Sequence, residues 1–168
     1  MKRIALLKTL TVILFVICIV TMFFTVPFIL VLAVMPGQIP FKINGHAADT
    51  LGIETILCML AAVVGFAFFI YALHLFKKTL ELFEKKKMFH ADVVKYLDQT
   101  GKAILIGYTI TAATTFIYNT LVENNLELNV ALGFDSSFFI VGLGLFFLVL
   151  SDVFLMAKNI KDENDLTL

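Results

Sequence analysis

Asp152 is the residue best suited to chemistry, because it is an acid inside a long apolar stretch near the end of the chain. A carboxylate at the centre of a membrane span costs about 2.5–3.5 kcal/mol, and less near the interface, so such acids often serve as proton, ion or ligand sites. The alternative is a structural role, either as a solvated residue at the membrane interface or as the partner of another polar side chain. Four side chains are candidates for that partnership: Lys8, Lys77, Lys102 and His74.

Small and hydroxylated side chains form a second group of candidate functional residues. Gly107 and the residues that follow it at helical spacing share one face of a helix: Thr111, Thr114, Thr115 and Tyr118. Such residues let membrane helices approach closely and form hydrogen bonds across the contact. The same side chains, Thr111 and Thr115 above all, can also line a polar path for a ligand. Three small residues earlier in the chain suit the same helix contact: Ala61, Ala62 and Gly65.

A third group combines imidazole and carboxylate side chains at His46, Asp49 and Glu54. These residue types can bind zinc, but here they lack the paired spacing and the cysteines of zinc signatures. The chain also has no Gly-rich phosphate loop, no His-Glu-x-x-His sequence and no Gly-x-Ser-x-Gly elbow. The sequence therefore predicts no metal site, no cofactor and no enzymatic activity, with a solvated connector around His46.

Four long apolar blocks must position these side chains. Of the 168 residues, 60% are apolar, and the mean hydropathy is +0.96, whereas soluble domains average about 45–50% apolar residues. About 20 apolar residues cross a hydrocarbon layer about 30 Å thick as a helix, and the blocks lack the alternation of barrel strands. The sequence predicts an all-α integral membrane four-helix bundle that forms one domain, 1–168. The expected spans are residues 10–35, 53–76, 103–122 and 136–157.

Positive charge alternates between the two sides of these spans. The five polar stretches around the blocks contain, in chain order, three, one, seven, none and two Lys or Arg residues. Short loops rich in Lys and Arg stay on the cytoplasmic side of a membrane. We therefore expect a cytoplasmic N-terminus, middle loop (residues 77–102) and C-terminus. A basic surface confined in this way makes direct nucleic-acid binding a poor interpretation.

The middle loop, residues 77–102, has helical amphipathicity of its own. Apolar residues recur at helical spacing over 75–83 and again over 93–97, with charged residues between them. One interpretation is a cytoplasmic helical hairpin that extends the second and third helices and turns at 87–89. The other lays the segment on the inner leaflet, with lysines near anionic headgroups. Either arrangement exposes a candidate partner surface: Lys78, Lys85, Lys86, Lys87 and Phe89.

The end of the chain resembles the closing motif of a bacterial membrane family. Ser151-Asp152-Val153-Phe154 lies in the fourth span, and the chain ends in Glu163-Asn164-Asp165-Leu166-Thr167-Leu168. An acid before Phe in the last helix, and an acidic-Asn-Asp-Leu-Thr-aliphatic tail, are similar to the four-span proteins of domain-of-unknown-function family 2975. The middle loop is similar as well, with Phe89, Leu97 and Gly101.

The resemblance also has two departures. His90 stands where the family often has Thr, and Asp152 stands where Glu is commoner. The family implies a bacterial inner-membrane location and frequent adjacency to a gene for a small Cro-like helix-turn-helix regulator. It implies no known activity, and so it assigns no catalytic residues to this chain.

Taken together, these features predict a small non-enzymatic protein of the bacterial plasma membrane with a regulatory or interaction role. Besides the lipid bilayer, the expected partner is a cytoplasmic or membrane protein that binds the basic loop 77–102. One alternative is a subunit of an oligomeric transporter or channel, in which several copies of the chain line a path with Asp152. Another alternative is protection of the cell against a membrane-active peptide.

Overall fold

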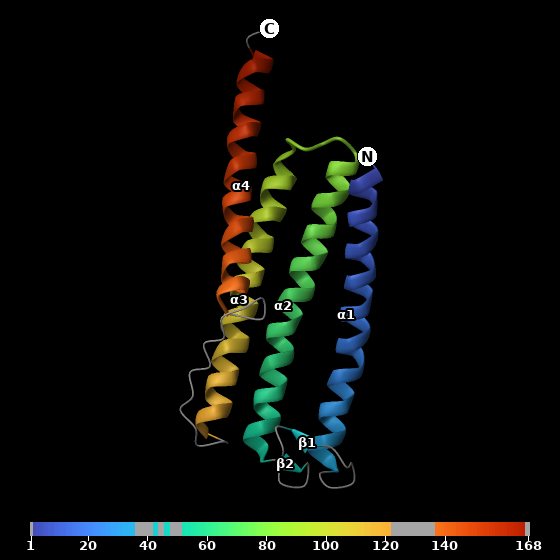
Figure 1. Cartoon of the computed structure of the whole chain (residues 1–168), viewed down its shortest axis with the longest axis vertical. Coiled ribbons are helices and arrows are strands. Elements are labelled where there is room, and N and C mark those ends of the chain that lie inside the picture. Colours follow the sequence, from blue (N-terminus) through green and yellow to red (C-terminus); the bar gives the residue numbers. More distant parts are fainter. Residues whose placement is uncertain (1, 36–41, 44–45, 48–51, 122–136, 167–168) are drawn as a thin grey trace.

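Four long helices make up most of the chain (Figure 1). The computed structural model describes residues 2–35, 42–43, 46–47, 52–121 and 137–166. The helices are α1 (Lys2–Val34), α2 (Ile53–Glu84), α3 (Ala91–Leu121) and α4 (Ser137–Leu166). Each is long and apolar enough to cross a membrane. The structure thus confirms an all-α fold with four helices able to span a membrane, which indicates a multi-pass membrane protein.

The helices are longer than the apolar spans that predict them. They contain 33, 32, 31 and 30 residues, which corresponds to lengths of about 45–50 Å, against a hydrocarbon layer of about 30 Å. The extra turns carry charge, because α2 continues to Glu84 and α3 begins at Ala91. α1 continues through Pro27 without a break, although proline supplies no backbone N–H to the helix.

A short pair of antiparallel strands follows α1. β1 (Lys42–Ile43) pairs with β2 (His46–Ala47), with Lys42 opposite Ala47 and Ile43 opposite His46. In Figure 1 this pair lies at the end of the molecule far from the connection between α2 and α3.

Consecutive helices pack as neighbours, in the order α1, α2, α3, α4. α2 and α3 come close together at Gly65 and Gly107. A Cβ atom on Gly107 would lie 3.0 Å from the carbonyl oxygen of Gly65, and one on Gly65 would lie 2.5 Å from the hydroxyl of Thr111. Small residues permit this spacing between membrane helices, so the two glycines set the α2–α3 distance.

Gly101 and Gly144 set the distance between α3 and α4 in the same way. A Cβ atom on Gly101 would lie 2.7 Å from the carbonyl oxygen of Gly144, and one on Gly144 would lie 2.8 Å from the side chain of Leu105. A small buried core lies beside this contact, formed by Ala72, Ala103 and Ile104 with Phe69, Ile140 and Phe147 packed against it.

Aromatic side chains connect α4 to α2 as well. Phe147 packs against Phe76, and Phe154 stacks on Phe83, each pair with ring centroids 5.5 Å apart. α4 therefore lies against both arms of the α2–α3 pair at the end where these helices are joined.

α4 is displaced along the molecule relative to α3. Gly144 lies beside Gly101, and the Ser151 hydroxyl donates a hydrogen bond to the backbone carbonyl of Val94. This register puts the apolar stretch of α4 beside the first half of α3, whereas the apolar half of α3 begins near residue 103. The two stretches are offset by about 14 residues, or about 20 Å. Figure 1 shows the result, since α4 extends well past the α2–α3 connection.

Candidate functional site

The connection between α2 and α3, residues 85–90, begins with a hydrogen-bonded helix end. The Lys86 N–H donates to the carbonyl of Phe83 at 3.1 Å, and the Lys87 N–H donates to the carbonyl of Leu82 at 2.9 Å. These two bonds define a Schellman motif, which satisfies carbonyl groups that the helix leaves without partners. Lys86 has φ 57°, in the left-handed region that normally favours glycine.

His90 caps the start of α3. Its Nδ1 atom accepts a hydrogen bond from the backbone N–H of Asp92 at 3.2 Å, and its backbone carbonyl accepts one from the N–H of Val93 at 3.0 Å. The first N–H groups of a helix lack partners within it, so an acceptor at this position stabilises the helix. The Asp92 carboxylate lies 3.2 Å from the same imidazole nitrogen. His90 therefore performs the capping role that Thr performs well in other helices.

Exposed cations and exposed apolar side chains meet in this connection. Lys85, Lys86 and Lys87 are exposed, and Met88 and Phe89 are 39% and 43% exposed. Within the described residues, no ion pair neutralises any of these three lysines. We call residues 85–89 the lysine turn.

Lys78, which the sequence groups with the lysine turn, has a different environment. It is half-buried, and its Nζ atom lies 5.5 Å from the centroid of the Tyr96 ring. A cation over an aromatic face is held by the ring quadrupole. Lys78 of α2 thus contacts α3. The exposed positive charge of this region lies in the lysine turn.

The end of α2 and the start of α3, on either side of the lysine turn, bury their apolar faces against each other. The buried residues are Leu75, Thr79 and Leu80 of α2 with Val93, Leu97 and Thr100 of α3. The hydroxyls of Thr79 and Thr100 each donate to a carbonyl of their own helix, at 3.2 Å and 2.7 Å. The lysine turn is therefore the end of a packed antiparallel pair of helices.

An ion pair joins α1 to this end of the molecule. The Nζ atom of Lys8 lies 2.8 Å from Oε2 of Glu84, just before the lysine turn, and both side chains are partly exposed. The two residues are 76 positions apart, so nothing in their local sequence pairs them. The contact places the start of α1 level with the end of α2.

Asp152 lies on the exposed side of α4, next to the buried Ser151. Within the described residues it forms no hydrogen bond and no ion pair. The four side chains proposed as its partners make other contacts: Lys8 with Glu84, Lys77 with Glu81, Lys102 with Asp98, and His74 with Phe15. The polar residue that binds α4 to α3 is Ser151, which the sequence did not single out.

His74 packs between α1 and α2. Its ring centroid lies 5.6 Å from that of Phe15, and the Nζ atom of Lys77 lies 6.0 Å from the centroid of the same phenylalanine. These contacts favour a packing role for His74, at the contact of two neighbouring helices and away from Asp152.

The hydroxyls of the Thr-rich helix α3 bond within their own helix. Thr111 donates to the carbonyl of Gly107 at 2.9 Å, and Thr115 donates to the carbonyl of Thr111 at 3.0 Å. Thr111 also lies at the close contact with Gly65, whereas Thr115 is exposed on the outer side of α3. The geometry therefore favours a role in helix packing for Thr111. Thr111 and Thr115 do not line a common ligand path.

The residues considered as zinc ligands are only partly described. Asp49 lies outside the described residues, His46 is described only as part of β2, and Glu54 is exposed in the first turn of α2. Among the described residues, no group of three His, Cys, Asp or Glu side chains lies close enough to hold a metal ion.

Comparison with known proteins gives one match. The model of the family described as "Protein of unknown function (DUF2975)" matches residues 40–168, a range that includes both strands, α2, α3 and α4. No curated protein and no solved structure matches the chain.

Proposed function

The chain belongs to the DUF2975 family of unknown function, as the match over residues 40–168 shows, and we propose that it docks a protein partner through the lysine turn. In this proposal it is a non-enzymatic, regulatory or interaction component of a bacterial plasma membrane, with the lysine turn in the cytoplasm. The excess of Lys and Arg in the middle loop supports that orientation.

The observation that carries the proposal is the composition of the lysine turn. Three lysines without ion-pair partners in the described residues stand beside the exposed side chains of Met88 and Phe89. Exposed apolar groups supply area that a partner can bury, while charges around them select the partner and speed its association. The surface fits a partner that offers an apolar hollow with an acidic rim.

The local structure supports docking of a protein over a segment that lies flat on lipid. The Schellman motif fixes the backbone at Lys86, and His90 caps the following helix. The Lys8–Glu84 ion pair adds α1 to the same end. A surface that already holds its bound shape loses less conformational entropy when a partner binds.

Site-specific crosslinking in the membranes of the native bacterium tests this proposal. A photo-reactive residue in place of Phe89 is expected to form an adduct with one protein, and Lys85→Gln, Lys86→Gln and Lys87→Gln together are expected to reduce its yield at least about tenfold. The matched control is the same probe in place of Phe116, an exposed phenylalanine of α3 far from the turn. Adducts with lipid alone, or equal protein adducts at both positions, would contradict the proposal.

The exposed position of Asp152 favours a second candidate function. An oligomeric transporter or channel would use a carboxylate that faces a path between copies of the chain. Ion or proton flux into vesicles that contain the purified protein tests this candidate, with Asp152→Asn as the matched variant. Absence of flux from the unchanged protein, or equal flux from the variant, would remove it.

A further inference from the structure

α4 carries a stripe of apolar side chains that its own bundle leaves uncovered. The large members are Phe146, Val149, Val153, Met156 and Ile160, which are 50% to 61% exposed. Gly142 occupies the first position of the series, and a Cβ built there meets no atom within 4 Å in the described residues apart from its own helix backbone. We call these six residues the α4 stripe.

The spacing of the α4 stripe is that of a coiled-coil contact. From Gly142 to Ile160 the steps alternate between four and three residues, which gives the 3.5-residue period that keeps one seam facing a partner helix. The opposite face of α4 is already in use, because Gly144 and Ser151, seven residues apart, contact α3. The stripe is therefore a separate contact face along more than two heptads of one helix.

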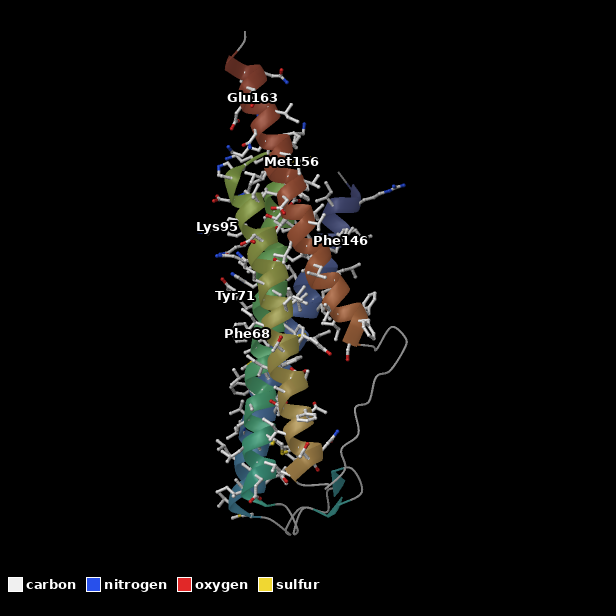
Figure 2. All side chains as sticks on the ribbon, turned by 90° about the vertical axis from the view of Figure 1, so that its left-hand side faces the viewer. Phe68, Tyr71, Lys95, Phe146, Met156 and Glu163 are labelled. Atoms are coloured by element: carbon white, nitrogen blue, oxygen red, sulfur yellow. The ribbon has the colours of Figure 1, made fainter. Side chains whose placement is uncertain are left out.

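Part of the α4 stripe lies at the level of charged residues of α3. The register at Ser151 puts Val153 level with the first turns of α3, where Lys95 is exposed. In Figure 2, Met156 lies nearer than Lys95 to the C-terminal end of α4. Ile160 follows Met156 by about one turn, in the part of α4 that extends past the lysine turn. Charged side chains favour water at this level of α3, and a protein partner would bury the apolar side chains of α4 at the same level.

Charged residues at the C-terminal end of α4 lie on the face opposite the α4 stripe. Lys158 pairs with Asp162 at 2.7 Å, and heptad positions put both on the side opposite Met156 and Ile160, together with Lys161. This part of α4 is therefore an amphipathic helix whose apolar side continues the contact face of the span. The stripe ends where Glu163 takes the next position.

We propose that a second copy of this chain covers the α4 stripe, so that two α4 helices form a parallel left-handed coiled coil about a two-fold axis along the membrane normal. Two copies inserted in the same direction present the same level of α4 to each other, and a two-fold axis makes one patch its own partner. The stripe is self-complementary because it is apolar from Gly142 to Ile160, and Gly142 permits close approach of two helices. In this pairing Asp152 of one copy lies beside Ala157 of the other, so the two acids do not face each other.

This proposal is independent of the proposed function, because the coiled coil uses α4 and leaves the lysine turn exposed. A cysteine-crosslinking series in native membranes tests it, in the full chain with Cys18→Ala and Cys58→Ala. Val153→Cys, Met156→Cys and Ile160→Cys are introduced one at a time, and an oxidant then joins cysteines that lie within disulfide distance. The matched controls are Leu155→Cys and Lys161→Cys, which are exposed on the same turns of α4 but off the stripe.

The expected result is a dimer band for each stripe position, at least about five times stronger than for either control. Two differently tagged copies expressed together are expected to appear in one disulfide-linked species. Met156→Ser in the Val153→Cys chain is expected to weaken that band while leaving membrane insertion unchanged. Equal yields at all five positions, monomer alone, or crosslinks only to a different protein would each overturn the proposal.

Discussion

Ser151 and Val94 join α4 to the first turns of α3 through one hydrogen bond, in which Oγ of the serine lies 2.8 Å from the carbonyl oxygen of the valine. Ser151 is only 3% exposed, whereas the adjacent Asp152 is exposed. Of two neighbouring polar residues on α4, the serine fixes the level of the helix and the acid faces outward.

The first prediction separates these neighbours. Ser151→Ala is expected to lower the free energy of unfolding by about 0.5–1.5 kcal/mol, since it removes an interhelical hydrogen bond. Asp152→Asn is expected to change that free energy by less than about 0.5 kcal/mol, because it alters an exposed group. Unfolding of the purified proteins in one detergent measures both values. Equal losses from the two substitutions would contradict the register described for α4.

The second prediction concerns the backbone of the lysine turn. Lys86→Gly is expected to raise the free energy of unfolding by up to about 1 kcal/mol, because relief of the left-handed conformation, about 1–2 kcal/mol, exceeds the extra backbone entropy that glycine loses on folding, about 0.5–1 kcal/mol. Lys85→Gly is the matched control, since Lys85 has φ −77° and gains nothing from glycine there. The same detergent unfolding assay compares the two variants. A similar gain from both would show that the left-handed conformation of Lys86 carries no strain.

The third prediction concerns the cap of α3. His90→Ala is expected to lower the free energy of unfolding by about 0.5–2 kcal/mol, because the N–H of Asp92 loses its acceptor. His90→Thr is expected to retain the stability of the unchanged protein, since a threonine hydroxyl accepts the same type of bond. Thermal unfolding followed by circular dichroism distinguishes the two outcomes. A threonine variant as unstable as the alanine variant would argue against a capping role.

The fourth prediction concerns the α2–α3 contact. Gly107→Ala is expected to lower the free energy of unfolding by about 1–3 kcal/mol, because its Cβ would lie 3.0 Å from the Gly65 carbonyl oxygen and 3.1 Å from the Cβ of Phe68. The control is Gly142→Ala in the monomeric protein, because its Cβ meets no atom within 4 Å in the described residues apart from its own helix backbone, and it gains up to about 1 kcal/mol from helix propensity. Destabilisation by both to the same extent would remove the special role of Gly107.

The fifth prediction concerns the attachment of α1. Lys8→Glu is expected to lower the melting temperature slightly at low ionic strength, because it puts two acids together where Lys8 now lies 2.8 Å from Glu84. Adding Glu84→Lys is expected to restore part of the loss, and salt is expected to reduce the whole effect, as it does for partly exposed charges. If the double variant melts below Lys8→Glu at every salt concentration, the two side chains do not interact.

The helices and much of their pairing follow from the sequence. Each apolar block is long enough to require a helix in lipid, and Gly65 and Gly107 mark a close helix contact by their size alone. The apolar period around Leu80 and Val93 likewise indicates that helices continue past the spans, and both residues are buried in the structure. These features are local, so the period of apolar residues or the size of a single residue is enough to predict them.

The level of α4 does not follow from the sequence. Hydropathy gives the length of a span but not its axial position against a neighbour, which here depends on the Gly101–Gly144 approach and on Ser151. The positive φ of Lys86 is equally hidden, since lysine is not a residue that marks this conformation. Residue type and depth in the sequence indicate four candidate partners for Asp152, and the structure gives each of them a different neighbour.

The displacement of α4 also gives the described part of the molecule a taper. Near the lysine turn α4 lies beside the other helices, whereas at the other end α1, α2 and α3 continue without α4 (Figure 1). A membrane-spanning body of this shape occupies more area in one leaflet than in the other. We therefore expect its insertion to depend on the curvature of the membrane.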